Sequence, residues 1–369
     1  MFELSTFILN IATFYGIYLI LALSFNIEYG YTGLPNFGKV LFYSIGAYLA
    51  GGLAAWAAIT VAGFFPEVRG GMPAYCAGEA YNVMTQVAAT NPALDIGVFL
   101  LSFVLAVLLG ALVGVVASYP TLRRTGHFLA ITLLALGEIV RIAAHTELWP
   151  VCGYNGLSGL PTPFEWLPGY GPYLYTALVL AIAAGVYMIT ERMVNSPWGR
   201  ALKAVRDDEL AALVYGKNAA KVKAQAMAVG SALAALAGVL YVFHVGGAFA
   251  DDFIPLPTFM VIAMVMLGGS ANNKGVIFGT AVIILIDQLL NTSVVNALGI
   301  PLPPGILNAT TYIKYMIMGL IIVLLLMFRP QGILPEKPLT TPVVVETKRV
   351  VGETTIQQQS QERESAASE

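Results

Sequence analysis

The chain carries little charge. Only 11% of its 369 residues are charged, whereas soluble domains carry about 25%. Apolar residues make up 57% of the chain, above the roughly 45 to 50% of soluble proteins. This shortage of charge excludes an ordinary soluble domain and indicates a membrane protein. The net charge is −2, and the basic residues are spread without interleaved aromatic residues, which argues against nucleic-acid binding.

The sequence also lacks the patterns of catalytic and cofactor sites. Its two cysteines, Cys76 and Cys152, do not have the spacing of a zinc or redox motif. No phosphate-binding loop is present, because the closest stretch, Gly269 to Lys274, lacks the second glycine before the lysine and the hydroxyl residue after it. We find no defensible Ser-His-Asp, Cys-His or paired-carboxylate arrangement. The sequence therefore predicts a chain that is not an enzyme and has no metal or cofactor of its own.

Long apolar runs are abundant instead. A helix needs about 20 mainly apolar residues to cross the hydrocarbon core, because each backbone group must find its partner within the segment. We predict an all-α, polytopic transmembrane bundle of nine spans, within a range of eight to ten. The runs are 6–27, 39–64, 93–117, 127–144, 173–190, 224–245, 256–269, 276–290 and 312–328. The seventh and eighth are short for full spans, which would suit half-helices that enter the membrane.

The placement of Lys and Arg predicts the orientation, because cytoplasmic loops are enriched in basic residues. An N-terminus outside places 16 of the 19 basic residues inside and leaves only Arg69, Arg141 and Lys314 toward the outside. We therefore expect the N-terminus outside and the C-terminus inside a cell membrane. Residues 1–334 form the predicted transmembrane domain, and 335–369 read as a disordered cytoplasmic tail.

Both cysteines fall in loops that this orientation places outside, at 65–92 and 145–172. We hypothesise a disulfide between Cys76 and Cys152, because an extracytoplasmic compartment permits one. The alternative is two free thiols, since their separation in space cannot be read from sequence.

One segment, 192–223, interrupts the apolar pattern with seven basic and three acidic residues. Ser196 before Pro197 predicts a helix start, and Gly216 predicts its end. One amphipathic helix is expected from about Pro197 to Tyr215, and Asn218 can cap a second helix that leads into the next span. The segment then forms a helical protrusion, with its charges either docking a partner or merely keeping it out of the bilayer.

Several strings resemble one known family. Glu209 to Ala212, followed by Gly216, resembles the "EAA" loop with which ABC-transporter permeases contact their ATPase subunit. Five strings occur in one order: "ALSFNIEYGYTGLPNFGKVLFYSIGAY", "GEIVR", "NGLSGLP", "GRALKAVRDDELAALVYGKN" and "FRPQGIL". Together they resemble the branched-chain amino-acid ABC permease family, in its LivM-like branch, over roughly 21–334. Lys39 departs from the histidine of many members, and the outer loop around Cys76 has no match.

The resemblance implies an importer subunit that translocates branched-chain or other apolar amino acids. It implies a heterodimer with a LivH-like permease, two cytoplasmic ATPases that bind ATP and Mg, and an extracytoplasmic solute-binding protein. The remaining surface of the subunit would contact membrane lipid. The ATPase contact would fall on Asp208, Glu209, Ala211, Ala212 and Gly216. Urea or short amides, which close relatives carry, remain an alternative substrate.

Ionisable groups within spans cost roughly 2.5 to 3.5 kcal/mol on insertion scales, so they tend to face protein or water. Glu138 and Arg141 lie three residues apart, on one helix face. For a zwitterionic amino acid, Arg141 and Lys314 could bind the carboxylate, and Glu138 and Asp287 the ammonium, with Gln288 beside them. Alternatively, Glu138 and Arg141 neutralise each other and never meet the solute.

A dense run of helix-breaking residues lies at the inner end of the first span. These residues are Gly30, Gly33, Pro35 and Gly38. The turn is a candidate cytoplasmic gate. Alternatively it is a plain connection, in which Asn26, Glu28 and Asn36 satisfy exposed backbone.

Two other function classes remain open. A secondary transporter working alone would use the intramembrane charges as ion-coupling groups and would need no ATP. A membrane-embedded enzyme would need a catalytic constellation, and we find none. Neither has a use for the Ala-Ala-x-x-x-Gly string of the charged loop, so co-purification of an ATPase discriminates between these classes.

Overall fold

The structure is a computed structural model. It describes residues 4–63, 74–76, 80–119, 126–147, 151–160, 162–164, 166–167, 169–291, 304–329 and 331–336. Contacts divide the chain into two units, Met1–Pro335 and Glu336–Glu369. The predicted tail, 335–369, lies outside the described residues except for its first two.

Six helices in the described part of the chain are long and apolar enough to cross a membrane. They are α1 (Leu4–Phe25), which a π-helix η1 (Asn26–Tyr31) continues, α2 (Lys39–Ala62), α4 (Pro92–Ser118), α5 (Gly126–Thr146), α6 (Gly171–Val194) and α9 (Ala219–Val245). Three more apolar helices follow: α10 (Leu256–Gly268), α11 (Asn273–Leu289) and α13 (Pro304–Phe328). Each predicted run lies within or largely within one of these nine helices, which confirms the all-α polytopic class. The number of spans and the orientation stay predictions.

Helix α9 is at the centre of the bundle, and 78% of its most apolar 18-residue stretch is buried. It packs against α1, α2 and α4. A Cβ at Gly46 of α2 would overlap the carbonyl oxygen of Ala235, and a Cβ at Gly238 of α9 would overlap that of Tyr43. The two backbones therefore touch directly, which is how membrane helices gain packing without a hydrophobic driving force between them.

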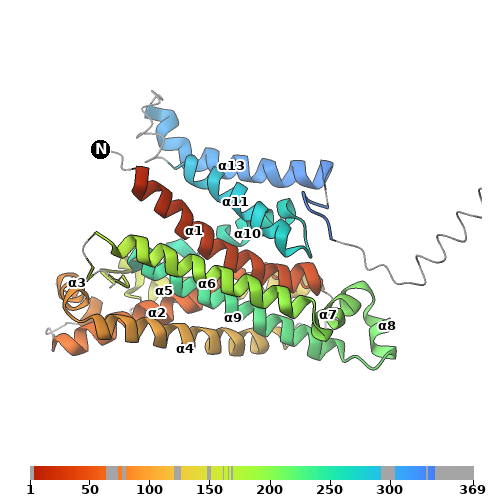
Figure 1. Cartoon of the computed structure of the whole chain (residues 1–369), viewed down its shortest axis with the longest axis horizontal. Helices are drawn as coiled ribbons and strands as arrows, with labels where there is room; N and C mark the ends of the chain where they lie inside the picture. The colour runs from red at the N-terminus through yellow and green to blue at the C-terminus, as the bar shows by residue number, and fades with distance from the viewer. Residues whose placement is uncertain are drawn as a thin grey trace, which may run out of the picture. The chain divides into compact units, whose positions relative to one another are not determined.

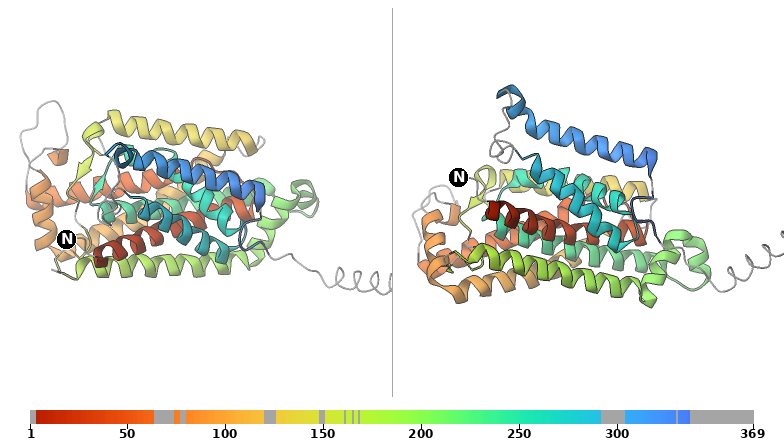
Figure 2. Two further views of the ribbon diagram at one scale, coloured as in Figure 1. Left: turned by 90° about the horizontal axis from the view of Figure 1, so that it is seen from above. Right: turned by 45° about the horizontal axis from the view of Figure 1, so that its top comes forward.

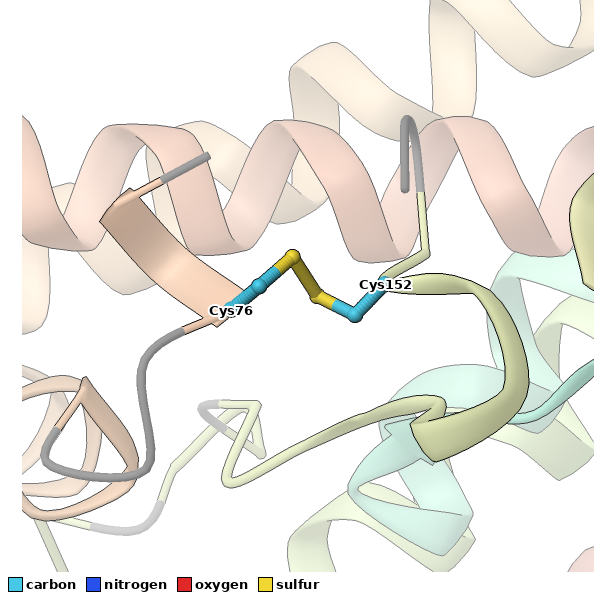
Figure 3. Close-up of a disulfide and its surroundings, with 2 residues drawn as sticks. All are labelled: Cys76 and Cys152. Carbon is cyan, nitrogen blue, oxygen red and sulfur yellow. A yellow bond between two sulfur atoms is a disulfide. The ribbon is translucent and has the colours of Figure 1, made fainter. Parts of the chain in front are cut away.

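The two ends of the bundle differ. Figure 1 shows α3 (Ala80–Thr90) and the start of α1 at one end, and α7 (Pro197–Asp207) and α8 (Glu209–Val214) at the other. Both views in Figure 2 show the same separation. We call the first the disulfide end, because Cys76 in η3 (Ala74–Cys76) and Cys152, just before η4 (Gly153–Asn155), are joined there (Figure 3). This is the pair for which the sequence suggested a bridge.

Short elements that the sequence does not predict complete the disulfide end. Strands β1 (Leu157–Ser158) and β2 (Gly247–Ala248) pair antiparallel, with Leu157 opposite Ala248. The 3₁₀ turn η5 (Ala250–Phe253) follows. These pieces are too short to leave a periodic pattern in the sequence.

The charged loop forms the opposite end, which we call the knob. The predicted single helix from Pro197 to Tyr215 is wrong: there are two helices, α7 (Pro197–Asp207) and α8 (Glu209–Val214). Asp208 separates them in an extended conformation, and its carboxylate accepts hydrogen bonds from the N–H groups of Leu210 and Ala211. Aspartate is a favoured N-cap, and here that preference restarts the helix. The predicted caps at Ser196 and Asn218 are both confirmed.

Candidate functional site

The knob presents an apolar surface on α8. The side chains of Leu210, Val214 and Tyr215 are 74%, 85% and 84% exposed, respectively, and Leu213 is also exposed. We call these four side chains the α8 face. Exposed apolar patches occur at protein or membrane interaction sites.

The predicted coupling residues have different places on the knob. Ala211 is exposed, whereas Ala212 is buried beneath the α8 face. The ATPase contact predicted for these residues stays a prediction. The carboxylate of Glu209 lies 2.6 Å from Lys223 Nζ of α9 and ties α8 to that helix. Gly216 has a φ of +76°, a conformation that glycine adopts without cost, and it ends the short helix.

A buried charge pair lies where η1 and α2 meet. Lys39 Nζ lies 2.8 Å from Glu28 Oε2, and both side chains are 0% exposed. Asn36 donates to the same carboxylate oxygen at 2.8 Å and accepts a hydrogen bond from the N–H of Gly38. The expectation that these residues satisfy backbone groups of the turn holds for Asn36, although the site is buried rather than exposed. It is wrong for Glu28, whose carboxylate is bonded to Lys39 and Asn36 instead.

Asn26 extends this polar network to other helices. Its amide donates to Asn273 Oδ1 of α11 at 2.9 Å, and its oxygen accepts from the N–H of Ala271. Asn273 in turn donates to Glu191 Oε2 of α6 at 2.9 Å. Asn26 therefore does satisfy one backbone group, but that group is buried and belongs to a distant segment rather than to the exposed turn. Together with the Glu28–Lys39 pair and the remaining residues of η1, these residues form what we call the junction.

The knob contacts the junction directly. Arg206 of α7 donates from Nη1 to the carbonyl oxygen of Gly30 at 2.7 Å. Lys203 of the same helix lies over the ring of Tyr31, with Nζ 5.4 Å from the ring centroid. Gly30 and Tyr31 both belong to η1, so the predicted turn begins within a π-helix and the knob contacts that π-helix directly. A π-helix is a distortion frequent at functional sites. The role of the turn as a gate stays a prediction.

The predicted pathway charges form two separate pairs. Arg141 Nε donates to Glu138 Oε1 at 3.0 Å, on α5. Lys314 Nζ of α13 lies 2.5 Å from Asp287 Oδ1 of α11. Gln288 is buried beside Asp287. Each cation thus already has an acidic partner within the chain, and contact of these residues with solute stays a prediction.

The Glu138–Arg141 pair continues into η5 at the disulfide end. Arg141 Nη1 also lies 3.3 Å from Asp251 Oδ1, and His145 Nε2 lies 4.0 Å from the same oxygen. Beside it, burial raises the pKa of the Asp252 carboxyl, while a hydrogen bond from Tyr241 acts in the opposite direction. Acidic and basic side chains therefore lie close together in this cluster.

Sequence reasoning missed several residues of the junction and of its contact with the knob. Arg206 lies inside a string that resembles the family, but a basic residue in so charged a segment is expected to face solvent. Glu191 and Asn273 are far apart in sequence and belong to no motif. The one signal was a lysine at position 39 directly after a glycine-rich turn and an acidic residue, Glu28, at the end of an apolar run. Each is costly to bury alone.

Comparisons with known proteins agree with one another. The family model described as "Branched-chain amino acid transport system / permease component" matches residues 7–326. The chain is 36% identical to the "Probable branched-chain amino acid transport permease protein LivM" of Methanocaldococcus jannaschii, over 90% of this chain and 94% of that protein. It is 27% identical to the "High-affinity branched-chain amino acid transport system permease protein LivM" of Escherichia coli, over 90% of this chain and 71% of that protein.

A more distant relative is the "Probable ABC transporter permease protein YphD" of Escherichia coli, 26% identical over 50% of this chain and 56% of that protein. No solved structure matches the chain.

Proposed function

Because the chain belongs to the permease-component family of branched-chain amino acid transport systems, we propose that it is the membrane subunit of an ABC importer for branched-chain or other apolar amino acids. A separate ATPase supplies the energy by docking on the knob. This chain has no phosphate-binding loop, so ATP is bound by that partner.

The α8 face carries this proposal. It places exposed apolar side chains beyond the ends of the apolar helices, on a helix that Asp208 caps and Lys223 anchors. A rigid apolar surface of this kind suits a cleft in a partner subunit. Side chains that a helix already holds in place lose little conformational entropy when a partner binds them. The contact between Arg206 and Gly30 offers a direct route from that surface to the junction.

An ABC importer also requires further partner subunits. We propose a second permease of the same family beside this chain, two ATPase subunits on the knob end, and a solute-binding protein on the disulfide end. The cluster around Arg141 and Asp251 combines an exposed carboxylate with a half-buried guanidinium, which suits a transient polar contact with that binding protein.

Substitutions on the α8 face test the ATPase contact. In the co-expressed complex, Val214→Asp and Gly216→Arg should release the ATPase subunits, because one places a charge in an apolar contact and the other distorts the turn. Tyr154→Asp, at an equally exposed position on the disulfide end, should leave the ATPases bound. If the ATPases co-purify unchanged with Val214→Asp and Gly216→Arg, the docking site is wrong.

Uptake measurements test the substrate class. Proteoliposomes with the whole complex and its binding protein should accumulate leucine, isoleucine or valine only when ATP is supplied. Preferential uptake of urea or acetamide would assign the complex to the amide-transporting branch. Uptake by this chain alone without ATP would establish the secondary-transporter alternative.

A further inference from the structure

A groove of about 560 Å³ runs along one face of α2, between α4 and α5. Its floor includes Ile45, Leu49 and Trp56 of α2, which helical spacing places on one face. Leu105 of α4 and Ala143 of α5 belong to its two walls. Helix α2 packs against both α4 and α5, whereas α4 and α5 have no extensive contact with each other in the described part of the chain. The groove therefore opens sideways, between two predicted spans.

The groove is too narrow for another helix. Its floor extends from Ile45 to Trp56, about 16 Å at a rise of 1.5 Å per residue. The volume divided by that length gives a cross-section of about 34 Å², whereas a helix about 10 Å across covers roughly 80 Å². A span of a second subunit therefore does not fit into the groove, but a single hydrocarbon chain does.

The surface beside the groove is apolar. Leu101, Val104 and Leu108 of α4 are exposed on a helix long and apolar enough to cross a membrane. Exposed apolar side chains along a span face the hydrocarbon chains of the bilayer. Leu105, on the same helix, forms part of the groove wall. A lipid chain can therefore enter the groove from the bilayer without crossing water.

The disulfide end of the groove is polar. Tyr75 of η3 and Glu147, directly after α5, line it there. Trp56 lies toward the same end of α2, and tryptophan is enriched at the depth of lipid headgroups. Glu147 is the single charged side chain among the described residues that line the groove, and no ion pair joins it to another described residue. Its carboxylate attracts an ammonium group and repels a headgroup that carries only negative charge.

Two hydroxyls of the groove lack a hydrogen-bond partner. The side chains of Tyr48 and Tyr75 both line the groove, and both are buried. Neither hydroxyl has a partner among the described residues. A buried polar group without a partner costs free energy, so both hydroxyls gain from a ligand with acceptor oxygens. A phospholipid supplies such oxygens in its phosphate and in its links to glycerol, directly beside its hydrocarbon chains.

We propose that this groove binds one phospholipid whose headgroup carries an ammonium group. The ammonium lies beside Glu147, the lipid oxygens accept hydrogen bonds from Tyr48 and Tyr75, and one hydrocarbon chain lies along α2. The lipid fills the space between α4 and α5 and supports α5, which carries the Glu138–Arg141 pair, against the bundle. This site does not depend on the solute that the chain transports.

Native mass spectrometry of the purified full chain in detergent tests the headgroup. The chain is given equal amounts of phosphatidylethanolamine and phosphatidylglycerol with identical acyl chains. One phosphatidylethanolamine should stay bound in preference to phosphatidylglycerol, and Glu147→Gln should reduce that preference by up to about fivefold, the effect of an exposed ion pair. Equal retention of the two lipids by the wild-type chain, an unchanged preference in Glu147→Gln, or no retained lipid overturns the proposal.

A substitution that fills the groove tests its location. Ala143→Trp places a large side chain in the groove wall, so the lipid should no longer be retained. Ile189→Trp is the matched control, because Ile189 is exposed on α6 and does not line the groove. It should retain the lipid as the wild-type chain does. Equal retention by both variants would place the lipid elsewhere and overturn the site.

Thermal unfolding in detergent tests the two hydroxyls. Without lipid, Tyr48→Phe and Tyr75→Phe should each unfold at a higher temperature than the wild-type chain, because a buried hydroxyl without a partner is gone. Added phosphatidylethanolamine should then stabilise each variant less than it stabilises the wild type.

Tyr43→Phe is the control for this test. The Tyr43 hydroxyl is also buried without a partner among the described residues, but Tyr43 does not line the groove. This variant should gain stability without lipid and keep the full response to phosphatidylethanolamine. An equal response to the lipid in all three variants and the wild-type chain overturns the proposal.

Discussion

At the scale of single residues, the Glu28–Lys39 pair is the strongest constraint on the inner end of the first span. Both side chains are fully buried, and the same carboxylate also accepts a hydrogen bond from Asn36. Removing one partner from a buried pair leaves an uncompensated charge, whereas removing both need not be costly. The pair therefore fixes the path of the turn between α1 and α2 more than it adds net stability.

Lys39→Met should destabilise the protein by about 3 to 5 kcal/mol, because it leaves Glu28 buried without a cation. Adding Glu28→Gln should recover most of the loss. Thermal unfolding in detergent, followed by tryptophan fluorescence, measures both effects. Equal destabilisation by the single and the double substitution would show that the two charges do not interact.

Arg206 is the residue through which the knob reaches the junction. Arg206→Gln removes a charged donor to the Gly30 carbonyl oxygen, an interaction worth about 1.5 to 3 kcal/mol. In the reconstituted complex we expect ATP hydrolysis to persist while the uptake per ATP falls. Arg200→Gln, at an exposed position of the same helix α7, should leave that ratio unchanged. A normal ratio in Arg206→Gln would remove this contact from the coupling route.

At the scale of elements, the break between α7 and α8 depends on one side chain. Asp208→Ala removes the cap of α8, which should cost about 1 kcal/mol. Amide hydrogen exchange at Leu210 and Ala211 should then become roughly fivefold faster. Asp207→Ala, one residue earlier and without a capping role for α8, should leave both rates unchanged. Slow exchange in Asp208→Ala would mean that packing against α9 holds the helix instead.

The element boundaries show where sequence patterns suffice. Ser196, Gly216 and Asn218 act within one turn of the chain, so their caps and stop are predictable from sequence. Asp208 also acts locally, but it lies in a run of strong helix formers and its capping competes with helix continuation. The tertiary contact between Glu209 and Lys223 favours the second helix, and no local pattern contains it.

At the scale of the whole molecule, the orientation is open to a direct test. The native cysteines are joined, so a cysteine introduced by substitution supplies the reactive thiol. With the N-terminus outside, an impermeant maleimide should label Tyr170→Cys on intact cells, because this exposed residue lies at the disulfide end. It should label Lys217→Cys, on the knob, only after permeabilisation. The opposite labelling pattern would invert the predicted topology.

The sequence by itself determined the membrane class, the nine apolar runs, the family, and the caps of the charged loop at Ser196 and Asn218. Each of these depends on composition, on local periodicity or on short strings, which act over a few residues. Only the tertiary structure decided which distant groups meet: Cys76 with Cys152, Glu28 with Lys39, Asn26 with Asn273 and Arg206 with Gly30. Such contacts depend on how the helices pack, of which the close backbone approach of α2 to α9 is one example. The groove between α2, α4 and α5 has the same origin, because its floor and walls come from three helices that no local pattern connects.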